Sequence, residues 1–258
     1  NRSNPPSDAM HRRAKNMEKA LARIELVKKP LLEQHKMEVQ LTTKKRSSKN
    51  LFQLNGVNKH YGEKKLFENL ELHVHYQDRI AIVGANGTGK STLLNLLLGK
   101  IQPDTGSVEV GSSLSIGYLS QHAFEMSSQF TVIEEFRDKI SVSEGEARHI
   151  LAKFLFYGQD VFKKMNQLSG GERMRLRWAQ LVHLNHNVLI LDEPTNHLDI
   201  DSKEMIEEAL SQFKGTIIAV SHDRYFLDKF FDTTYLLQNE HLVKYLGNYS
   251  YVRSKLKE

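Results

Sequence analysis

The sequence predicts an α/β fold in which a largely parallel sheet holds a nucleotide at one edge. The run Gly84–Ser91, GANGTGKS, fits the phosphate-loop pattern G-x-x-x-x-G-K-[ST]. An apolar run, Arg79–Gly84, precedes this loop, and a helix-like run, Ser91–Leu98, follows it. Two further apolar runs, Val188–Leu191 and Thr216–Val220, are typical of strands in a parallel sheet covered on both faces. Together these observations predict that the loop binds a nucleoside triphosphate.

The residue types of the loop indicate how it holds phosphate. Gly84, Gly87 and Gly89 let the backbone turn sharply and point several N–H groups at one place. The N-terminus of the next helix adds roughly half a positive charge. We expect Lys90 to reach the outer phosphates and the Ser91 hydroxyl to join the coordination of Mg²⁺. A glycine turn with an incidental lysine is the alternative, and the flanking strand and helix count against it.

The N-terminal segment, residues 1–30, is predicted to be a basic linker helix. Its apolar positions form a narrow stripe with a 3.5-residue period, which suits one helix lying along another, at Met10, Ala14, Met17, Leu21 and Ile24. Pro30 ends this helix. Residues 1–50 contain 13 Lys and Arg against 5 Asp and Glu, whereas residues 51–258 contain 23 against 26. This asymmetry indicates a polyanionic partner such as RNA.

The nucleotide-binding body is predicted over residues 31–258. Before and after the phosphate loop we expect strands at Met37–Thr43, Leu51–Val57, Leu70–His75, Ser107–Val110 and Ser115–Leu119, with a hairpin connection between the first two. A helical insertion of about residues 130–185 follows, with helices at Val132–Ile140, Glu144–Phe156 and Glu172–Val182. A helix at Ser202–Phe213 separates the two apolar strands, and a hairpin of Thr233–Leu237 and Leu242–Leu246 closes the body.

Two acids follow the apolar strand Val188–Leu191. Carboxylates at the carboxyl end of a parallel strand lie where such sheets bind ligands. We expect Asp192 to hold Mg²⁺, and Glu193 to orient and deprotonate the attacking water, a role typically worth about 10²–10⁴ in rate. An acidic turn after a strand is the simpler interpretation, but the phosphate loop favours the catalytic one.

The string Leu168–Glu172, LSGGE, stands before a helix and between the phosphate loop and the acidic strand. With these motifs the sequence resembles an ATP-binding cassette (ABC) nucleotide-binding domain over about residues 31–258. The resemblance implies an ABC-type P-loop fold with an antiparallel β subdomain and a helical subdomain. It also implies that this signature acts in trans, on the γ-phosphate of ATP held by an opposing domain, through Ser169, Gly170, Gly171 and Glu172.

The same resemblance implies roles for single residues. Tyr61, 23 residues before Gly84, would stack on adenine, and Asp199 would be the D-loop aspartate. The implied catalytic residues are Glu193, His222 on the γ-phosphate, and Gln121 near Mg²⁺ and the attacking water. The implied Mg²⁺ ligands are Ser91, Gln121 and Asp192. The implied ATP-binding residues are Tyr61, Gly84, Ala85, Asn86, Gly87, Thr88, Gly89, Lys90, Ser91 and Thr92.

A subgroup is indicated by Glu193–Asp199, EPTNHLD, which has Asn196-His197 where transporter domains usually have Ser-Ala. It resembles the ABC-F group, soluble two-cassette proteins that act on the ribosome as translation factors or in antibiotic resistance. Tyr245–Tyr251 resembles the end of the second cassette of that group. The resemblance implies a first cassette as partner, and the returning half of the inter-cassette linker in residues 1–30. Without its partner cassette, this chain would be either a monomer or a symmetric homodimer.

Two other function classes remain as alternatives. The cassette also suits the ATP-binding subunit of a membrane transporter, although the linker stripe and Asn196-His197 count against it. A chromosome-maintenance ATPase would place a long coiled coil between loop and signature, where only 79 residues separate Lys90 from Ser169. No run approaches 18 consecutive apolar residues, so we expect no membrane span. The absence of cysteine, the polar start and the missing initiator Met suggest a cytoplasmic protein of which this is a part.

The basic helix provides candidates for ribosomal RNA contacts, since Lys and Arg side chains outside the apolar stripe are free to meet phosphates. The candidates are Arg12, Arg13, Lys15, Lys19 and Arg23. The alternative is that these charges only keep an exposed helix soluble.

Overall fold

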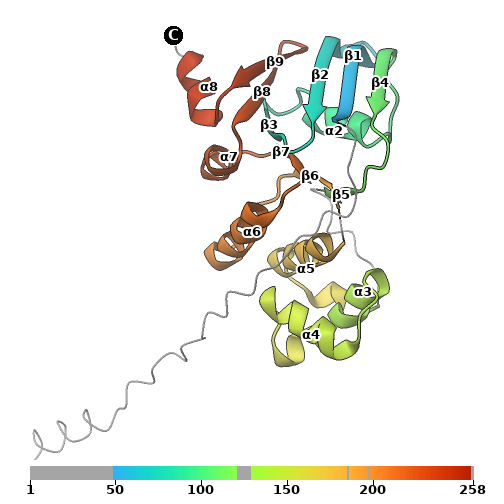
Figure 1. Cartoon of the computed structure of the whole chain (residues 1–258), viewed down its shortest axis with the longest axis vertical. Coiled ribbons are helices and arrows are strands. Elements are labelled where there is room, and N and C mark those ends of the chain that lie inside the picture. The colour runs from blue at the N-terminus through green and yellow to red at the C-terminus, as the bar shows by residue number, and fades with distance from the viewer. Residues whose placement is uncertain (1–48, 121–128, 185, 197, 257–258) are drawn as a thin grey trace, which may run out of the picture. The chain divides into compact units, whose positions relative to one another are not determined.

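The computed structural model describes residues 49–120, 129–184, 186–196 and 198–256 (Figure 1). All of them belong to one compact unit, Gln40–Glu258. Some sequence predictions lie outside the described residues: the basic linker helix with its RNA-binding candidates, the strand Met37–Thr43 with the hairpin connection after it, Gln121, and His197 of the subgroup motif.

A six-stranded sheet runs through the centre of this unit, in the order β5-β6-β7-β3-β8-β9. Its strands are β3 (Arg79–Val83), β5 (Ile116–Leu119), β6 (Val188–Asp192), β7 (Thr216–Val220), β8 (Thr233–Gln238) and β9 (His241–Leu246). Neighbours from β5 to β8 are parallel, and β9 is antiparallel to β8. Asn239 and Glu240 connect β8 to β9 with φ of 48° and 69°, as a two-residue hairpin turn requires. The predicted parallel sheet and closing hairpin are confirmed.

The central strands send alternate side chains into two separate cores, because successive residues of a strand point to opposite faces. In β6, Val188 and Ile190 belong to one core while Leu189 and Leu191 belong to the other. The first core also contains α2 (Lys90–Leu97) and residues of a second sheet. The other core contains residues of the helices on the opposite face. Burial on both faces explains why these strands are continuously apolar in the sequence.

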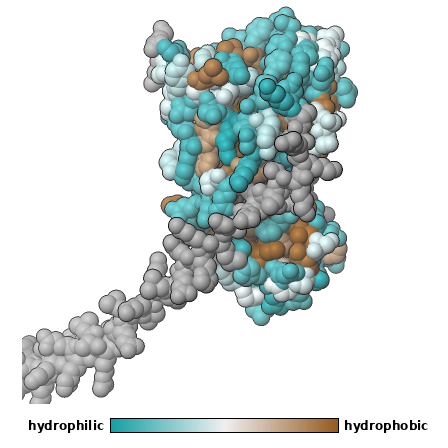
Figure 2. Space-filling model, in the orientation of Figure 1, coloured by the Kyte–Doolittle hydropathy of each residue, from teal (hydrophilic) through white to brown (hydrophobic). Residues whose placement is uncertain are grey.

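The second sheet has three antiparallel strands, in the order β2-β1-β4. They are β1 (Asn50–Tyr61), β2 (Lys64–His75) and β4 (Thr105–Val110), and all three are longer than predicted. Bulges explain the difference for β1 and β2, because their register shifts repeatedly and Asn69 has a φ of 47°, which interrupts the alternation of polar and apolar residues. Figure 2 shows mainly hydrophilic residues over this sheet, whose other side faces the core.

The helical insertion contains α3 (Val132–Lys139), α4 (Glu144–Lys153) and α5 (Gly170–His183), with the 3₁₀ turns η1 (Gly158–Phe162) and η2 (Met165–Gln167) between α4 and α5. Each α-helix begins with a capping box, from Thr131, Ser143 and Ser169 respectively. The insertion is confirmed. Beyond it lie α6 (Ile200–Gln212), α7 (Arg224–Phe230) and α8 (Tyr249–Lys255). The last two were not predicted, since seven residues are too few to show a helical period.

Candidate nucleotide site

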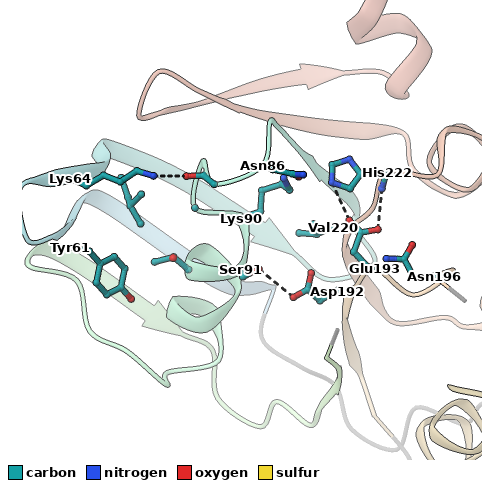
Figure 3. A pocket seen from close by; sticks show the side chains of 14 residues that line it. Tyr61, Lys64, Asn86, Lys90, Ser91, Asp192, Glu193, Asn196, Val220 and His222 are labelled. Carbon is teal, nitrogen blue, oxygen red and sulfur yellow. Dashed lines mark hydrogen bonds and ion pairs between the residues drawn. The ribbon is translucent and has the colours of Figure 1, made fainter. Parts of the chain in front are cut away.

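Three neighbouring strands, β6, β7 and β3, end at the same edge of the central sheet. Asp192 is paired with Val220, and Ile82 is paired with the same residue from the other side. The phosphate loop after β3, the acids after β6 and His222 after β7 therefore meet at one place, as expected for the carboxyl edge of a parallel sheet. They surround a cavity of about 550 Å³, lined by Tyr61, Lys64, Leu66, Asn86, Gly87, Gly89, Lys90, Ser91, Thr92, Asp192, Glu193, Asn196, Val220 and His222 (Figure 3).

Lys90 is held inside the phosphate loop. Its ammonium donates hydrogen bonds to the carbonyl oxygens of Gly84, at 2.8 Å, and Ala85, at 2.9 Å, and its side chain is buried. Thr88 Oγ1 donates to the same Ala85 oxygen at 2.9 Å. Burial lowers the pKa of Lys90, and the nearby Glu193 and Asp192 carboxylates oppose that shift. The loop thus holds one cation at the point where phosphate oxygens are expected.

Two glycines of the loop are required by close neighbours. A Cβ on Gly84 would lie 2.5 Å from the backbone oxygen of Leu237 in β8. Gly89 has a φ of 107°, and a Cβ there would lie 2.8 Å from the Phe67 ring in β2. The loop is therefore wedged between the two sheets, which fixes its position above the cavity.

Ser91 and Asp192 form the polar pair that suits a divalent cation. Ser91 Oγ, in the first turn of α2, lies 3.5 Å from Asp192 Oδ2, at the end of β6. Mg²⁺ is usually held by one or two protein oxygens together with substrate phosphates and water. A hydroxyl and a carboxylate beside a phosphate loop fit that chemistry. Within the described residues no group of three or more acids or histidines forms a metal site of its own.

Glu193 is buried and faces His222. Its Oε2 accepts a hydrogen bond from the backbone N–H of His222 at 3.3 Å, and its Oε1 lies 3.5 Å from His222 Nε2. Burial raises the pKa of the Glu193 carboxyl, while His222 favours the charged form. Only 7% of the Glu193 side chain is exposed, against 58% for His222. Since a raised pKa makes a carboxylate a better proton acceptor near neutral pH, this pair suits base catalysis on a water.

Tyr61 lies at the opposite side of the loop from Glu193 and His222 (Figure 3). It ends β1, and 54% of it is exposed, so its ring is accessible for stacking on a base. Lys64, which begins β2, donates to the Gly87 carbonyl oxygen at 3.3 Å and joins the hairpin to the loop. The cavity thus has an aromatic end, a phosphate loop in the middle and an acid–histidine pair at the other end.

The signature residues lie elsewhere in the chain. Ser169 Oγ accepts a hydrogen bond from Glu172 N at 3.2 Å, and Glu172 Oε2 accepts one from Ser169 N at 2.8 Å. Asp199 caps α6 through Ser202 N at 2.9 Å and lies 3.7 Å from Arg175 of α5. Among the described residues that line the cavity, none comes from the signature or is Asp199. That arrangement is what a signature acting on another cassette requires.

The structure brings ten predicted site residues together around the cavity, with some that were not predicted. Of the predicted ATP-binding set, Gly84, Ala85 and Thr88 are not among the residues that line the cavity. Lys64 and Leu66 were missed because they precede the predicted strand Leu70–His75, and Val220 because its apolar run only indicates a buried strand. Asn196 was noted only as a subgroup marker, yet it lines the cavity beside Glu193 (Figure 3). Its place three residues after a catalytic candidate is the one signal that could have found it.

Comparison with known proteins decides the family. A family model described as "ABC transporter" matches residues 67–196, from β2 to the end of the acidic motif. The chain belongs to the ATP-binding cassette family. The predicted cassette is thereby confirmed.

The related sequences agree with the ABC-F subgroup. The cassette is 34% identical over 244 residues to "Ribosome protection protein VmlR" of Bacillus subtilis, covering 95% of this chain and 43% of that protein. It is 39% identical over 218 residues to "ATP-binding protein Uup" of Haemophilus influenzae, covering 82% and 34%. It is 34% identical over 249 residues to "ABC transporter F family member 5" of Arabidopsis thaliana, covering 94% and 36%. The chain spans about two fifths of the length of these curated relatives. The prediction of an ABC-F cassette is confirmed.

Solved structures agree with the fold. "Structure of ATP binding subunit of ABC transporter" aligns with a TM-score of 0.68 at 19% identity, over 80% of this cassette and 93% of that chain. "Structure of a bacterial Atm1-family ABC exporter with ATP bound" aligns with a TM-score of 0.69 at 20% identity, over 82% and 41%. The ABC-type α/β fold is confirmed. None of the described helices combines the length and apolar character that crossing a bilayer needs.

Proposed function

We propose that this cassette binds and hydrolyses ATP with Mg²⁺, and that the ATP cycle is coupled to ribosome binding. The observation that carries the hydrolytic part is the meeting of Lys90, Asp192, Glu193 and His222 at the carboxyl ends of three adjacent strands. Lys90 holds the outer phosphates, and Ser91 and Asp192 hold the metal ion. Mg²⁺, when bound, neutralises charge on the phosphates. Glu193 takes the proton of the attacking water, and His222 contacts the γ-phosphate.

The site becomes complete only with a second cassette. Support comes from the place of Ser169–Glu172, which begins α5 and contributes nothing to the cavity. This chain is then the second of two cassettes, and its signature serves the site of the first. We expect the chain alone to bind ATP but to hydrolyse it slowly. Fast turnover by a demonstrated monomer would contradict the in-trans arrangement.

Ribosome binding is supported by the relationship to a ribosome protection protein and by the basic N-terminal segment. The role as a transporter subunit has less support, because the related proteins named above include a ribosome protection protein and a member of the F family. A cytoplasmic location follows from this proposal. The proposed cassette chemistry is the same whether the ribosomal role is that of a general translation factor or of an antibiotic-resistance factor.

The test is co-sedimentation with ribosomes. The two-cassette protein, with Glu193→Gln and the matching change in its first cassette, is incubated with ribosomes and ATP and centrifuged through a sucrose cushion. We expect it to pellet with ribosomes in ATP and to remain in solution in ADP, because trapped ATP keeps the cassettes together. Co-purification with a membrane protein, and no ATP-dependent pelleting, would favour the transporter role.

A further inference from the structure

The C-terminal motif Tyr245–Tyr251 has no part in the proposed chemistry, yet it fastens α8 to the rest of the cassette. A Cβ on Gly247 would collide with the Tyr251 ring, so the ring packs directly on this glycine. Asn248 caps α8 through Tyr251 N at 3.1 Å. Thr234 of β8 donates to the Gly247 oxygen at 2.9 Å. Most of the motif therefore serves to start α8 at one place.

A carboxylate on α7 accepts two hydrogen bonds from the first turn of α8. Asp228 Oδ1 accepts a hydrogen bond from Ser250 N at 2.8 Å, and its Oδ2 accepts one from Ser250 Oγ. We name this pair of contacts the Asp228–Ser250 clamp. Both helices have only seven residues, so neither is stable without tertiary contacts. The clamp is therefore a polar contact that helps to fix each helix with respect to the other, alongside their buried apolar side chains.

The helix that carries Asp228 begins directly after the histidine of the nucleotide site. Asp223, the residue after His222, caps α7 through Phe226 N at 3.2 Å, and its own N–H donates to Ser221 Oγ at 3.1 Å. Lys203 of α6 contacts Asp223 Oδ2 at 2.8 Å. Any shift of α7 along its axis therefore moves the residue next to His222.

The far side of α8 also reaches this region. Tyr249, Val252 and Arg253 line a cavity of about 220 Å³ whose opposite wall includes the phosphate loop, at Gly84 and Ala85, and the segment Ser221-His222. The loop has its own internal bonds to Lys90 and Thr88, whereas among the described residues the exposed ring of His222 pairs with the side chain of Glu193. We therefore expect a displacement of α8 to move the His222 ring more than it moves the phosphate loop.

We propose that Asp228 and Ser250 are positioning residues for His222. This inference rests on the proposed role of His222 in ATP hydrolysis. Loosening the clamp lowers the rate of hydrolysis at saturating ATP and leaves ATP affinity nearly unchanged, because the phosphate loop keeps its own contacts.

The variants are chosen to separate positioning from folding. Ser250→Ala removes one hydrogen bond of the clamp and Asp228→Ala removes both. Ser250→Thr is the conservative variant, because it keeps a hydroxyl at this position. Ser254→Ala is the matched control, because Ser254 lies on the same helix and its hydroxyl donates only to Tyr251 O at 2.7 Å. Each variant is first checked for its thermal unfolding midpoint and ATP affinity.

The first readout needs no turnover. Histidine ring resonances are recorded on this chain with labelled histidine, and the His222 signal among the 12 histidines is assigned from its loss in His222→Ala. We expect Ser250→Ala and Asp228→Ala to move the His222 resonance, and Ser250→Thr and Ser254→Ala to leave it in place. An unmoved His222 resonance in both clamp variants overturns the inference.

The second readout is hydrolysis by the two-cassette protein. Loss of one hydrogen bond predicts about a threefold fall in kcat for Ser250→Ala and about tenfold for Asp228→Ala, with KM within twofold. In the His222→Ala background neither clamp variant lowers kcat further, whereas a merely structural role would lower it in both backgrounds. If His222→Ala itself leaves kcat unchanged, the proposed role of His222 fails. If His222→Ala lowers kcat while the clamp variants match Ser254→Ala, only the clamp inference fails.

Discussion

The backbone N–H of His222 donates a hydrogen bond to Glu193 Oε2 at 3.3 Å, and this contact joins the ends of two neighbouring strands. Glu193 N in turn donates to the Val220 oxygen at 2.8 Å. Glu193 has a φ of 53°, an unfavourable conformation for a residue with a side chain. The contacts on both sides hold it there, with its carboxylate turned toward the cavity.

Glu193→Gln is expected to keep ATP binding and to lose most hydrolysis, by about 10²–10⁴-fold, because an amide cannot accept the proton of the water. The measurement is phosphate release by the two-cassette protein, with the matching change in the first cassette, alongside ATP titration. Glu109→Gln, on an exposed position of β4, is the control and should behave like the parent. Unchanged turnover in the double variant would remove Glu193 from the catalytic role.

The same substitution is expected to raise thermal stability at neutral and higher pH. Burial raises the pKa of Glu193, so above its ordinary pKa the unfolded chain releases this proton more readily than the folded chain. Ionisation therefore favours the unfolded state as pH rises through this window, and Glu193→Gln has no such proton to lose.

Thermal unfolding at about pH 8 and about pH 4 checks this, since the two values bracket the window above the ordinary Glu pKa. The unfolding midpoint of Glu193→Gln should exceed that of the parent at the higher pH, and the advantage should shrink at the lower pH. An equal difference at both pH values would show that ionisation of Glu193 is not the cause.

Lys90→Ala is expected to weaken ATP binding by roughly tenfold or more, because the loop loses its charged donor to the outer phosphates. Nucleotide titration by calorimetry measures the effect. Lys100→Ala removes a lysine that contacts the Tyr118 ring outside the cavity, and it should bind ATP like the parent. Equal affinities for Lys90→Ala and the parent would count against the phosphate-loop interpretation.

Tyr61→Ala is expected to weaken ATP binding by about 5- to 150-fold, since stacking of a base on an aromatic ring contributes about 1–3 kcal/mol. Tyr61→Phe keeps the ring and should retain affinity. Tyr225→Ala, an exposed tyrosine away from the cavity, is the control. If inorganic triphosphate, which has no base, loses as much affinity as ATP, the residue does not act by stacking.

Replacing Arg12, Arg13, Lys15, Lys19 and Arg23 with Ala is expected to weaken ribosome binding and to flatten its dependence on salt, with ATP affinity unchanged. Each lost phosphate contact lowers the salt slope by about one unit or less. Co-sedimentation at several salt concentrations gives the slope. A control replaces the exposed Lys164 and Lys214 of the cassette. Identical slopes for the parent and the N-terminal variant would mean that these charges only keep the segment soluble.

The strands and loops that carry the chemistry were predictable because their signals are local. The phosphate loop, the acids after β6 and the apolar strands each follow from residue types within one short run. The length of β2 was not predictable, since a register shift at Leu66 places Leu66 and Phe67 in the core together, and a second irregularity follows at Asn69. Lys64 and Asn196 reach the cavity only because distant segments meet there.

The wedging of the phosphate loop bears on what its motif means. Gly84 is required by the Leu237 oxygen and Gly89 by the Phe67 ring, and both neighbours belong to strands that carry no proposed chemistry. A side chain at either position would collide with the scaffold whether or not the protein handles nucleotides. Packing alone therefore requires Gly84 and Gly89, and their presence is weaker evidence for a ligand than the loop pattern suggests. Lys90 and Ser91, for which packing among the described residues gives no such requirement, are the residues of the motif that indicate a triphosphate ligand.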